Sequence, residues 1–293
     1  MSYPRIFDYV YLRPLCLSAE RFASIHAFLK PRILGQVPLE VPSFEPKAGD
    51  LRPNRSMMTG RRNQFAGPRG DGRFYDEPKQ GVATIPIYGA LAKNLSAWEE
   101  ECGGGLDINR VEFALRQVLA AGDIHSVVLD IDSPGGSATG IPELAALVAQ
   151  VARAKTVYAF SDSTIASAAY WLASQATEVY ATGSSTIGSI GTYIAWLDPA
   201  IKMEMEGITL RLYKEGKHKG IGLPGRTMTK EDDEYLQSLV TEINDQFVGA
   251  VRAARPGVPD GAMEGQTFTG RRAIDAGLID GLVESFDELL AAI

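Results

Sequence analysis

From Val82 onward, short apolar runs alternate with segments of helical periodicity, and this alternation constrains the fold more than any other feature. Continuous apolar runs are typical of strands buried on both faces of a parallel sheet, and apolar residues recurring at i, i+3 and i+4 indicate amphipathic helices. The pattern therefore predicts an α/β fold with a mainly parallel sheet covered by helices. We expect strands at Val82–Tyr88, Ser126–Ile131, Thr156–Phe160, Glu178–Ala181 and Ile208–Tyr213, and helices at Ile108–Ala121, Ile141–Ala154, after Ile165 and at Thr229–Ala254.

The first eighty residues differ from the rest in composition. They hold 9 of the 16 prolines and 13 Lys and Arg against 8 Asp and Glu, although the whole chain has a net charge of −7. Periodicity is absent over most of this part, apart from one helix expected at Ser18–Leu29. We therefore predict two parts: a Pro/Arg-rich, partly irregular N-terminal arm over residues 1–80 and one domain over residues 81–293. The basic arm is interpreted as a docking or linker segment, and no nucleic acid is expected as a partner.

Composition excludes several classes of protein. An apolar fraction of 45% excludes global disorder. There is no apolar run long enough to cross a membrane and no secretory signal pattern at the N-terminus, so we expect a soluble protein without a membrane anchor. Two cysteines and three histidines are too few for a disulfide framework or a zinc cage, so we expect no metal and no cofactor.

Three loops that follow expected strands are candidates for chemistry, because ligands of such sheets bind beyond the carboxyl ends of the strands. The first is Asp132–Ser137, where Pro134 and two glycines could turn backbone amides toward a carbonyl oxygen. The second is Ser161–Tyr170, where Ser167 lies among alanines near a helix start. The third is the charged run Lys214–Lys219. Taken singly, each has an ordinary structural reading: a common turn, close helix packing, and a solvated surface loop.

These loops occur in one order with the tract Thr186–Gly191, the pair His218-Lys219 and the late segment Phe268–Ser285. The ordered set resembles the signal peptide peptidase A family of serine proteases and its phage relatives, the head-assembly proteases, from about Val82 to the C-terminus. The resemblance implies a crotonase-like spiral of β-β-α units akin to the Clp protease. It also implies that residues 81–293 form a serine protease domain that cuts peptide bonds with a Ser-Lys dyad.

The resemblance assigns roles to individual residues. Ser167 matches the nucleophile, Lys219 the general base, and Ser189 the serine that orients the lysine amine. Backbone N–H groups match the oxyanion hole at Gly135 or Gly136 and at Ser167 or its neighbour Ala168. The positions expected to line the bound substrate are Ser133, Pro134, Ser137 and Ala166.

A serine–lysine pair is chemically coherent without the family. A serine hydroxyl needs a base to become a nucleophile, and lysine can serve only when its amine is neutral. The pKa of an exposed lysine is ~10.4, and burial can lower this pKa by roughly 3 to 5 units. We therefore predict that Lys219 is desolvated once the site is assembled, while Lys214 and Lys217 stay hydrated.

Three other functional interpretations depend on particular residues. His218 is the one histidine in a plausible loop for a Ser-His-Asp triad, and this alternative stays open. Residues 220–225 satisfy G-x-G-x-x-G, but they do not join a strand to a helix start and include Pro224, so dinucleotide binding is rejected. A crotonase-type acyl-CoA enzyme is the rival of similar fold, although such enzymes need no Ser-Lys pair.

The resemblance favours a phage or prophage capsid maturation protease, because no membrane anchor is expected. Its implied substrates are scaffold or portal-type capsid proteins, and its implied assembly is a ring-like homo-oligomer in the bacterial cytoplasm, within an assembling procapsid. The alternatives are a soluble peptidase for signal-peptide or membrane-protein fragments and an inactive capsid assembly or scaffold protein. The sequence departs from the family at Ala168-Ala169, where many relatives have Gly-Gly.

Overall fold

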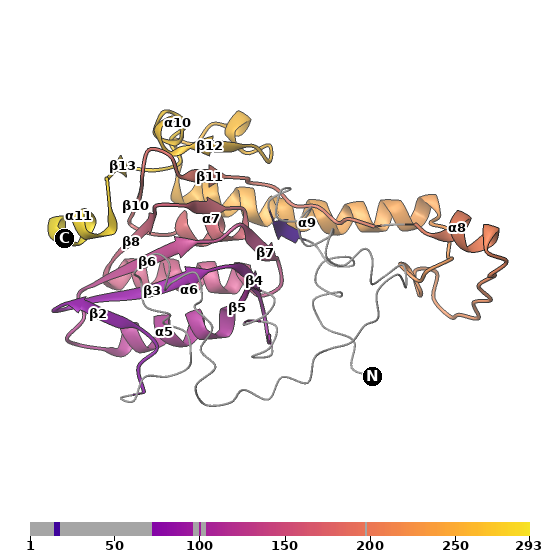
Figure 1. Cartoon of the computed structure of the whole chain (residues 1–293), viewed down its shortest axis with the longest axis horizontal. Helices are drawn as coiled ribbons and strands as arrows, with labels where there is room; N and C mark the ends of the chain where they lie inside the picture. The colour runs from indigo at the N-terminus through magenta and orange to yellow at the C-terminus, as the bar shows by residue number, and fades with distance from the viewer. Residues whose placement is uncertain (1–14, 18–71, 96–99, 101–103, 197) are drawn as a thin grey trace.

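A computed structural model describes residues 15–17, 72–95, 100, 104–196 and 198–293 (Figure 1). The helix predicted at Ser18–Leu29 lies outside these residues. None of the described helices is both long enough and apolar enough to cross a membrane.

A six-stranded sheet forms the centre of the fold, with the strand order β13-β10-β8-β6-β3-β2. All neighbouring pairs are parallel except β2–β3, which is antiparallel. The predicted α/β class with a mainly parallel sheet is therefore confirmed, and the four central strands begin at the predicted residues. The strands are β2 (Asp76–Lys79), β3 (Val82–Tyr88), β6 (Ser126–Asp132), β8 (Thr156–Ser161), β10 (Glu178–Ala181) and β13 (Gly281–Leu282).

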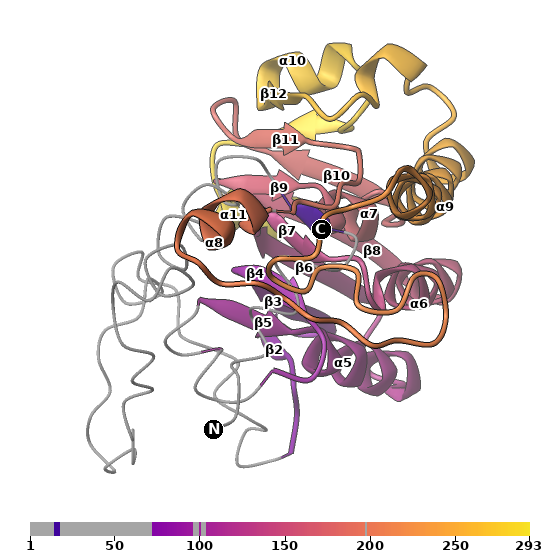
Figure 2. The same ribbon diagram turned by 90° about the vertical axis from the view of Figure 1, so that its right-hand side faces the viewer.

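Helices cover both faces of this sheet, because successive strand residues point to opposite sides. Ile85 and Ile87 belong to the main core, with the buried faces of α5 (Ile108–Ala120), α6 (Ile141–Ala154) and α7 (Ala168–Ala173). Val82, Val128 and Phe160 point the other way and pack against Leu289 of α11 (Phe286–Ala292). Figure 2 shows α5 and α6 along one side of the sheets.

The element order repeats a β-β-α unit. In β6–β7–α6 and in β8–β9–α7, the first strand joins the six-stranded sheet and the second joins a smaller one. This repetition is the spiral that the sequence resemblance implied. The smaller sheets have the orders β1-β7-β4-β5 and β12-β11-β9 and are built from β1 (Leu15–Leu17), β4 (Ala90–Ala92), β5 (Gly105–Asp107), β7 (Gly135–Ser137), β9 (Thr164–Ala166), β11 (Thr186–Gly188) and β12 (Thr267–Thr269).

Two strands lie in the described part of the first eighty residues, residues 15–17 and 72–80. β2 pairs with β3, and β1 pairs with β7. At least these parts of the expected arm are therefore joined to the sheets of the following domain.

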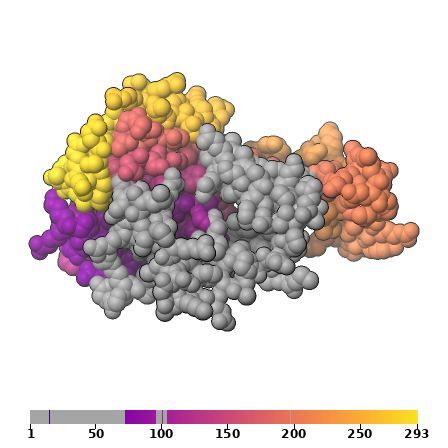
Figure 3. All heavy atoms as spheres, in the orientation of Figure 1, coloured from indigo at the N-terminus to yellow at the C-terminus, as the bar shows by residue number. Residues whose placement is uncertain are grey.

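The long helix α9 (Lys230–Ala254) packs on the core with only its C-terminal half. There Phe247 and Val251 are buried, and the Phe247 ring stacks on Trp171 of α7 at 4.6 Å and 3°. The N-terminal half projects from the body together with α8 (Ala200–Met205), as Figures 1 and 3 show. We call residues 198–243 the projecting segment. A 3-10 turn (Asp260–Ala262) and α10 (Gly270–Asp275) follow α9.

One predicted strand, Ile208–Tyr213, is wrong. These residues form no strand in the structure, and Leu210, Leu212 and Tyr213 are exposed. A strand needs a neighbour to receive its backbone hydrogen bonds, and this stretch lies on the projecting segment, away from the edges of the sheets (Figure 1). The helix predicted at Thr229–Ala254 is confirmed, including a capping box in which the Thr229 and Asp232 side chains each bond the other's backbone N–H.

Candidate active site

The first two candidate loops meet at the ends of β6 and β9. Ser133 forms a bridge with Ile165, and its N–H donates to the Thr164 carbonyl at 2.9 Å. In return, the Ala166 N–H donates to the Ser133 carbonyl at 3.1 Å. The glycine turn predicted for the oxyanion hole therefore lies against the strand that leads into Ser167.

The same geometry brings Ser167 and Ser189 side by side. Strands β9 and β11 are parallel, with Ala166 opposite Gly188, so the next residue on each strand is one of these serines. The Ser167 N–H donates to the Gly188 carbonyl at 2.7 Å, and the Ser189 N–H donates to Gln266 at 2.7 Å. Two of the three members of the predicted catalytic group are thus neighbours.

The backbone of Ser167 is strained. It has φ 56° and ψ −121°, outside the regions that L-residues with a Cβ usually adopt. Such a conformation costs roughly 1–3 kcal/mol and persists where surrounding structure enforces it, often at functional sites. Among the described residues, positive φ occurs at three non-glycine positions, Asn94, Ser167 and Ser189. No pattern in the sequence indicates this strain, although a small residue between a strand and a helix is compatible with it.

The Ser167 hydroxyl is buried without a partner. Its side chain is 1% exposed, and Oγ has no hydrogen-bond partner within the described part of the chain. The neighbouring Ala166, Ala168 and Ala169 are fully buried and have no polar side-chain atoms to bond the hydroxyl. A buried polar group left unsatisfied costs about 1–3 kcal/mol, and a catalytic role is one of the few explanations for keeping one.

The expected oxyanion donors occupy different local environments. Gly135 has φ 94° and its N–H donates to Ser133 Oγ at 3.2 Å, while that hydroxyl donates to Gly89 at 2.7 Å. At Gly136 a Cβ would lie 1.9 Å from the Leu91 carbonyl oxygen, so only glycine fits beside β4. Ala168 opens α7, where the first N–H groups have no intrahelical acceptor. The Gly135 amide is engaged by Ser133 Oγ, and Gly136 is paired with Leu91 of β4 and with Cys16 of β1, so the assignment of the oxyanion donors stays a prediction.

The remaining positions predicted to line the substrate are placed around the same turn. Ser133, Ser137 and Ala166 are buried, and Pro134 is half-buried. Their side chains have little surface to offer, so any contact with a substrate would use mainly their backbone.

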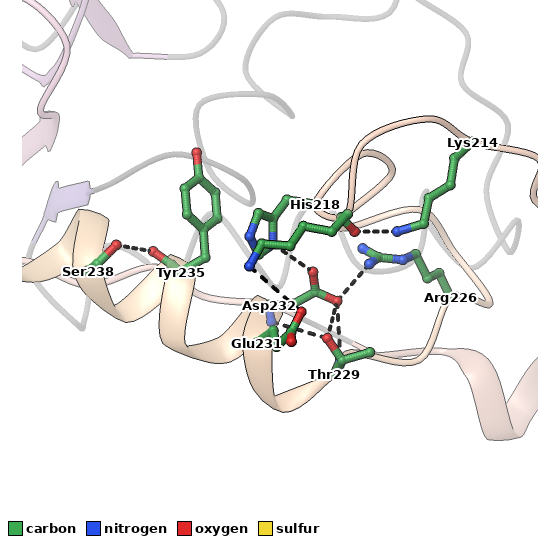
Figure 4. Close-up of polar contacts among 9 residues, drawn as sticks. Lys214, His218, Arg226, Thr229, Glu231, Asp232, Tyr235 and Ser238 are labelled. Carbon is green, nitrogen blue, oxygen red and sulfur yellow. Dashed lines mark hydrogen bonds and ion pairs between the residues drawn. The ribbon is translucent and has the colours of Figure 1, made fainter.

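Lys219 lies elsewhere, in the loop of the projecting segment between α8 and α9. Its side chain is exposed, as are those of Lys214 and Lys217. The adjacent His218 stacks on Tyr235 with ring centroids 4.6 Å apart, and its Nδ1 lies 3.2 Å from an Asp232 carboxylate oxygen (Figure 4). The loop is thereby attached to the first turns of α9.

Asp232 is the centre of this attachment. Its carboxylate is 1% exposed and accepts hydrogen bonds from Arg226 Nη2 at 2.6 Å and from Thr229 Oγ1 at 2.9 Å and N–H at 3.2 Å. Burial by itself would raise the pKa of this carboxyl. The bonds from Arg226, Thr229 and His218 outweigh burial and hold the pKa of Asp232 well below its usual range. The sequence predicted the capping box but not this larger cluster.

The structure does not bring Lys219 to Ser167 within one chain. Asp232, which anchors the Lys219 loop, precedes Phe247 by fifteen residues on α9, or about 22 Å along a helix. Phe247 stacks on α7, the helix that begins at Ser167. His218 is anchored at the same distant place. The catalytic roles of Ser167, Ser189 and Lys219 stay predictions. The distance between the Lys219 loop and the Ser167 turn within one chain does not test these roles.

Among the described residues, no group of three or more His, Cys, Asp or Glu side chains is placed to hold a metal ion.

A serine on a strained turn between a strand and a helix, beside a glycine loop of an α/β sheet, is the arrangement of hydrolases with a serine nucleophile. Sequence comparison agrees with this class. The profile of peptidase family S49 matches residues 149–292, so this part of the chain is similar to the S49 peptidases.

Individual relatives extend the likeness toward the N-terminus. "Capsid assembly protease C" of Escherichia phage lambda is 30% identical over 226 residues, which are 76% of this chain and 51% of that protein. "Head-tail preconnector protein GP5" of Enterobacteria phage P21 is 29% identical over 80% of this chain and 46% of that protein. A putative signal peptide peptidase SppA of Enterococcus faecium is 30% identical over 57% of this chain and 49% of that protein. The chain thus spans about half the length of these relatives.

Solved structures include distant likenesses. A ClpP1 mutant from Listeria monocytogenes has a TM-score of 0.40 at 12% identity, covering 70% of this chain and 94% of that one. An enoyl-CoA hydratase/isomerase family member has a TM-score of 0.37 at 19% identity, covering 72% and 70%.

Proposed function

We propose that this protein is a serine endopeptidase in which Ser167 is the nucleophile, Lys219 the general base and Ser189 the residue that orients the lysine amine. The observation that most supports this is the Ser167 turn: a strained backbone and a buried hydroxyl without a partner, next to Ser189 and the glycine loop. The S49 match over residues 149–292 supports a peptidase of this kind.

The chemistry follows from these positions. Ser167 Oγ attacks the substrate carbonyl carbon while its proton passes to the neutral amine of Lys219, and N–H groups of Gly136 and Ala168 stabilise the oxyanion. The tetrahedral intermediate collapses, the C–N bond breaks, and the Lys219 ammonium returns the proton to the leaving amine. A water molecule, deprotonated by the same lysine, then hydrolyses the acyl-enzyme.

We further propose that Lys219 reaches the Ser167 of a neighbouring copy in a ring-like oligomer. The projecting segment supports this, because it exposes large apolar side chains, among them Met205 at 84% and Tyr213 at 90%. Apolar side chains gathered on an exposed surface mark interaction sites. An interface there would also remove the Lys219 amine from water, the condition under which a lysine can act as a base at neutral pH.

The test of the dyad is cleavage of an unfolded polypeptide. Ser167→Ala and Lys219→Ala should each lower the rate by about 10⁴-fold or more, because members of such a catalytic unit are jointly required. Lys214→Ala and Lys217→Ala are the matched controls from the same loop and should keep activity. Retained activity in Ser167→Ala would overturn the proposed function.

We propose a role in phage head maturation because two of the relatives are named as phage capsid or connector proteins. The substrates would then be scaffold or portal-type proteins. Co-expression with the neighbouring virion proteins, followed by mass spectrometry of cut sites, tests this role. Cleavage of signal-peptide fragments in place of virion proteins would favour the SppA-like alternative.

A second candidate for the base is His218. Its Nδ1 contact with the buried Asp232 is the contact that orients histidine in a Ser-His-Asp triad. The argument against His218 is that Asp232 also accepts hydrogen bonds from Arg226 and Thr229, so its negative charge is already compensated. If the rising limb of the pH–rate profile disappears in His218→Ala and remains in Lys219→Ala, histidine is the base.

A further inference from the structure

A strand from the first eighty residues lies on the glycine turn of the candidate site. β1 (Leu15–Leu17) pairs antiparallel with β7, with Leu15 opposite Ser137, Cys16 opposite Gly136 and Leu17 opposite Gly135. Gly135 and Gly136 belong to the turn expected to form the oxyanion hole. Figure 1 shows β1, in indigo, beside β7.

The other side of β1 is also bonded. The Leu15 N–H donates to the Tyr193 carbonyl at 2.8 Å, and the Tyr193 N–H donates to the Leu15 carbonyl at 3.1 Å. Tyr193 lies four residues after Ser189. β1 therefore fills a slot between the backbone after β6 and the backbone after β11, the two segments that flank the nucleophile turn.

This slot has the properties of a peptide-binding edge. Peptides are often recognised by adding a strand to a sheet edge, where main-chain hydrogen bonds provide affinity independent of sequence. A protease gains from this mode, because an extended chain exposes its scissile carbonyl in a fixed register. Without β1, both β7 and Tyr193 would present unpaired backbone groups toward the same slot.

The burial of the nucleophile agrees with an occupied slot. Ser167 is 1% exposed, so its hydroxyl cannot meet a substrate in this arrangement. Leu15 is 2% exposed, which shows that β1 is packed as well as hydrogen-bonded. A segment must move before a substrate can enter, and β1 is the described segment on the edge that carries the oxyanion glycines.

We propose that β1 is a built-in occupant of the substrate slot. It autoinhibits the enzyme by pairing with β7 and Tyr193, and an extended substrate segment binds by replacing it as an antiparallel strand. The autoinhibition rests on the proposed function, because it concerns peptidase activity. The replacement of β1 by another strand does not depend on that function.

A reversible crosslink tests the autoinhibition. Opposed residues of an antiparallel pair lie about 4.5–5.5 Å apart at Cα, within reach of a disulfide. Leu15→Cys with Ser137→Cys, in a chain that also has Cys16→Ser and Cys102→Ser, should form this bond. The oxidised protein should lose at least about tenfold in kcat/KM for a peptide, and reduction should restore it, because only the slot-open fraction is competent.

Each protein serves as its own control here, since the oxidised and reduced forms have the same sequence, and the two single cysteine variants should not respond to oxidation. Equal activity in both forms, or failure of the disulfide to form, would overturn the inference. Leu15→Asp should conversely raise activity. Burying the unpaired carboxylate at this position is costly, so β1 should leave the slot more often.

A binding measurement separates this inference from the proposed function. In a Ser167→Ala background, a fluorescent peptide with the sequence of residues 11–21, with Cys16 replaced by serine, should bind the Leu15→Asp variant. It should bind the oxidised, locked variant at least about tenfold more weakly. This pattern supports strand exchange even if Ser167 is not a nucleophile, and equal binding to both variants, or binding to neither, would contradict it.

Discussion

The two regions that hold the candidate catalytic residues are built in opposite ways. Around Ser167, three sheets and α7 fix the backbone, and the neighbouring alanines are fully buried. Around Lys219, a loop without regular strands is attached to α9 by one buried carboxylate, and most side chains are exposed. The first region holds the proposed nucleophile in a buried, rigid environment, and the second region exposes the proposed base on a surface.

This difference is consistent with the proposal that Ser167 of one copy and Lys219 of a neighbouring copy form one divided site. A nucleophile gains from a rigid environment, because strain and alignment must be maintained against relaxation. A base that has to be desolvated can instead be presented on a surface, provided that assembly later covers it. The predictions below test this contrast, from the largest expected effect to the smallest.

Gly136→Ala should be the most damaging single change to stability. The new Cβ would lie 1.9 Å from the Leu91 carbonyl oxygen and 2.5 Å from the Leu91 nitrogen, and this backbone cannot yield without separating β7 from β4. We expect a loss of more than about 4 kcal/mol, or no folded protein. Gly122→Ala, where a Cβ meets nothing within 4 Å, is the matched control and should unfold like the wild type in urea.

The two halves of α9 should respond differently to loss of an aromatic ring. Phe247→Ala removes a fully buried ring stacked on Trp171 and should cost about 3–5 kcal/mol of global stability. Tyr235→Ala, on the projecting half, should leave the free energy of unfolding of the body, measured in urea, within about 0.5 kcal/mol of wild type. A large global effect of Tyr235→Ala would show that the projecting segment is part of the core.

Asp232 should make the attachment of the Lys219 loop depend on pH. Its pKa is lowered in the folded protein, so its contribution to stability is complete above the ordinary carboxyl pKa of about 3.9 and is lost as the pH falls below that value. Asp232→Asn should therefore increase hydrogen exchange of the first turns of α9 strongly at pH 7 and progressively less below pH ~4. A difference that stays constant with pH would contradict this role for the carboxylate.

Lys217→Ala should have the smallest effect. Its ammonium lies 3.8 Å from Glu231, and both side chains are about two-thirds exposed. Exposed pairs of this kind contribute roughly 0–1 kcal/mol. Neither the melting temperature nor peptide cleavage should change measurably, and a loss of cleavage would move the base from Lys219 to Lys217.

The parts of this structure that depend on local pattern were predictable from the sequence. β3, α6 and β10 have the expected bounds, because continuous apolar runs and i, i+3, i+4 spacing report directly on burial. Ile208–Tyr213 shows the limit, since its strand-like composition finds no neighbouring strand among the described residues. An alternating pattern of apolar residues specifies which face of a strand would be buried, but not which element of the fold covers that face.

The sequence proposes members for the candidate site but does not indicate its geometry. The resemblance assigns Ser167, Ser189 and the glycine turn to one site, and the parallel register of β9 and β11 with the Ser133–Ile165 bridge places these segments side by side. The strain at Ser167, the Asp232 cluster and the pairing of β1 with β7 depend on contacts between residues far apart in the chain. No local pattern encodes such contacts.

The most direct test of the divided site is complementation between two inactive chains. Ser167→Ala and Lys219→Ala copies, purified together by separate tags to ensure mixed oligomers, should regain activity where an intact Ser167 meets an intact Lys219 of the other copy. For an equal mixture, about a quarter of the wild-type rate is expected if each site draws one residue from each of two neighbours. Mixed oligomers as inactive as either variant alone would contradict the account, because Ser167 and Lys219 would then have to come from the same chain.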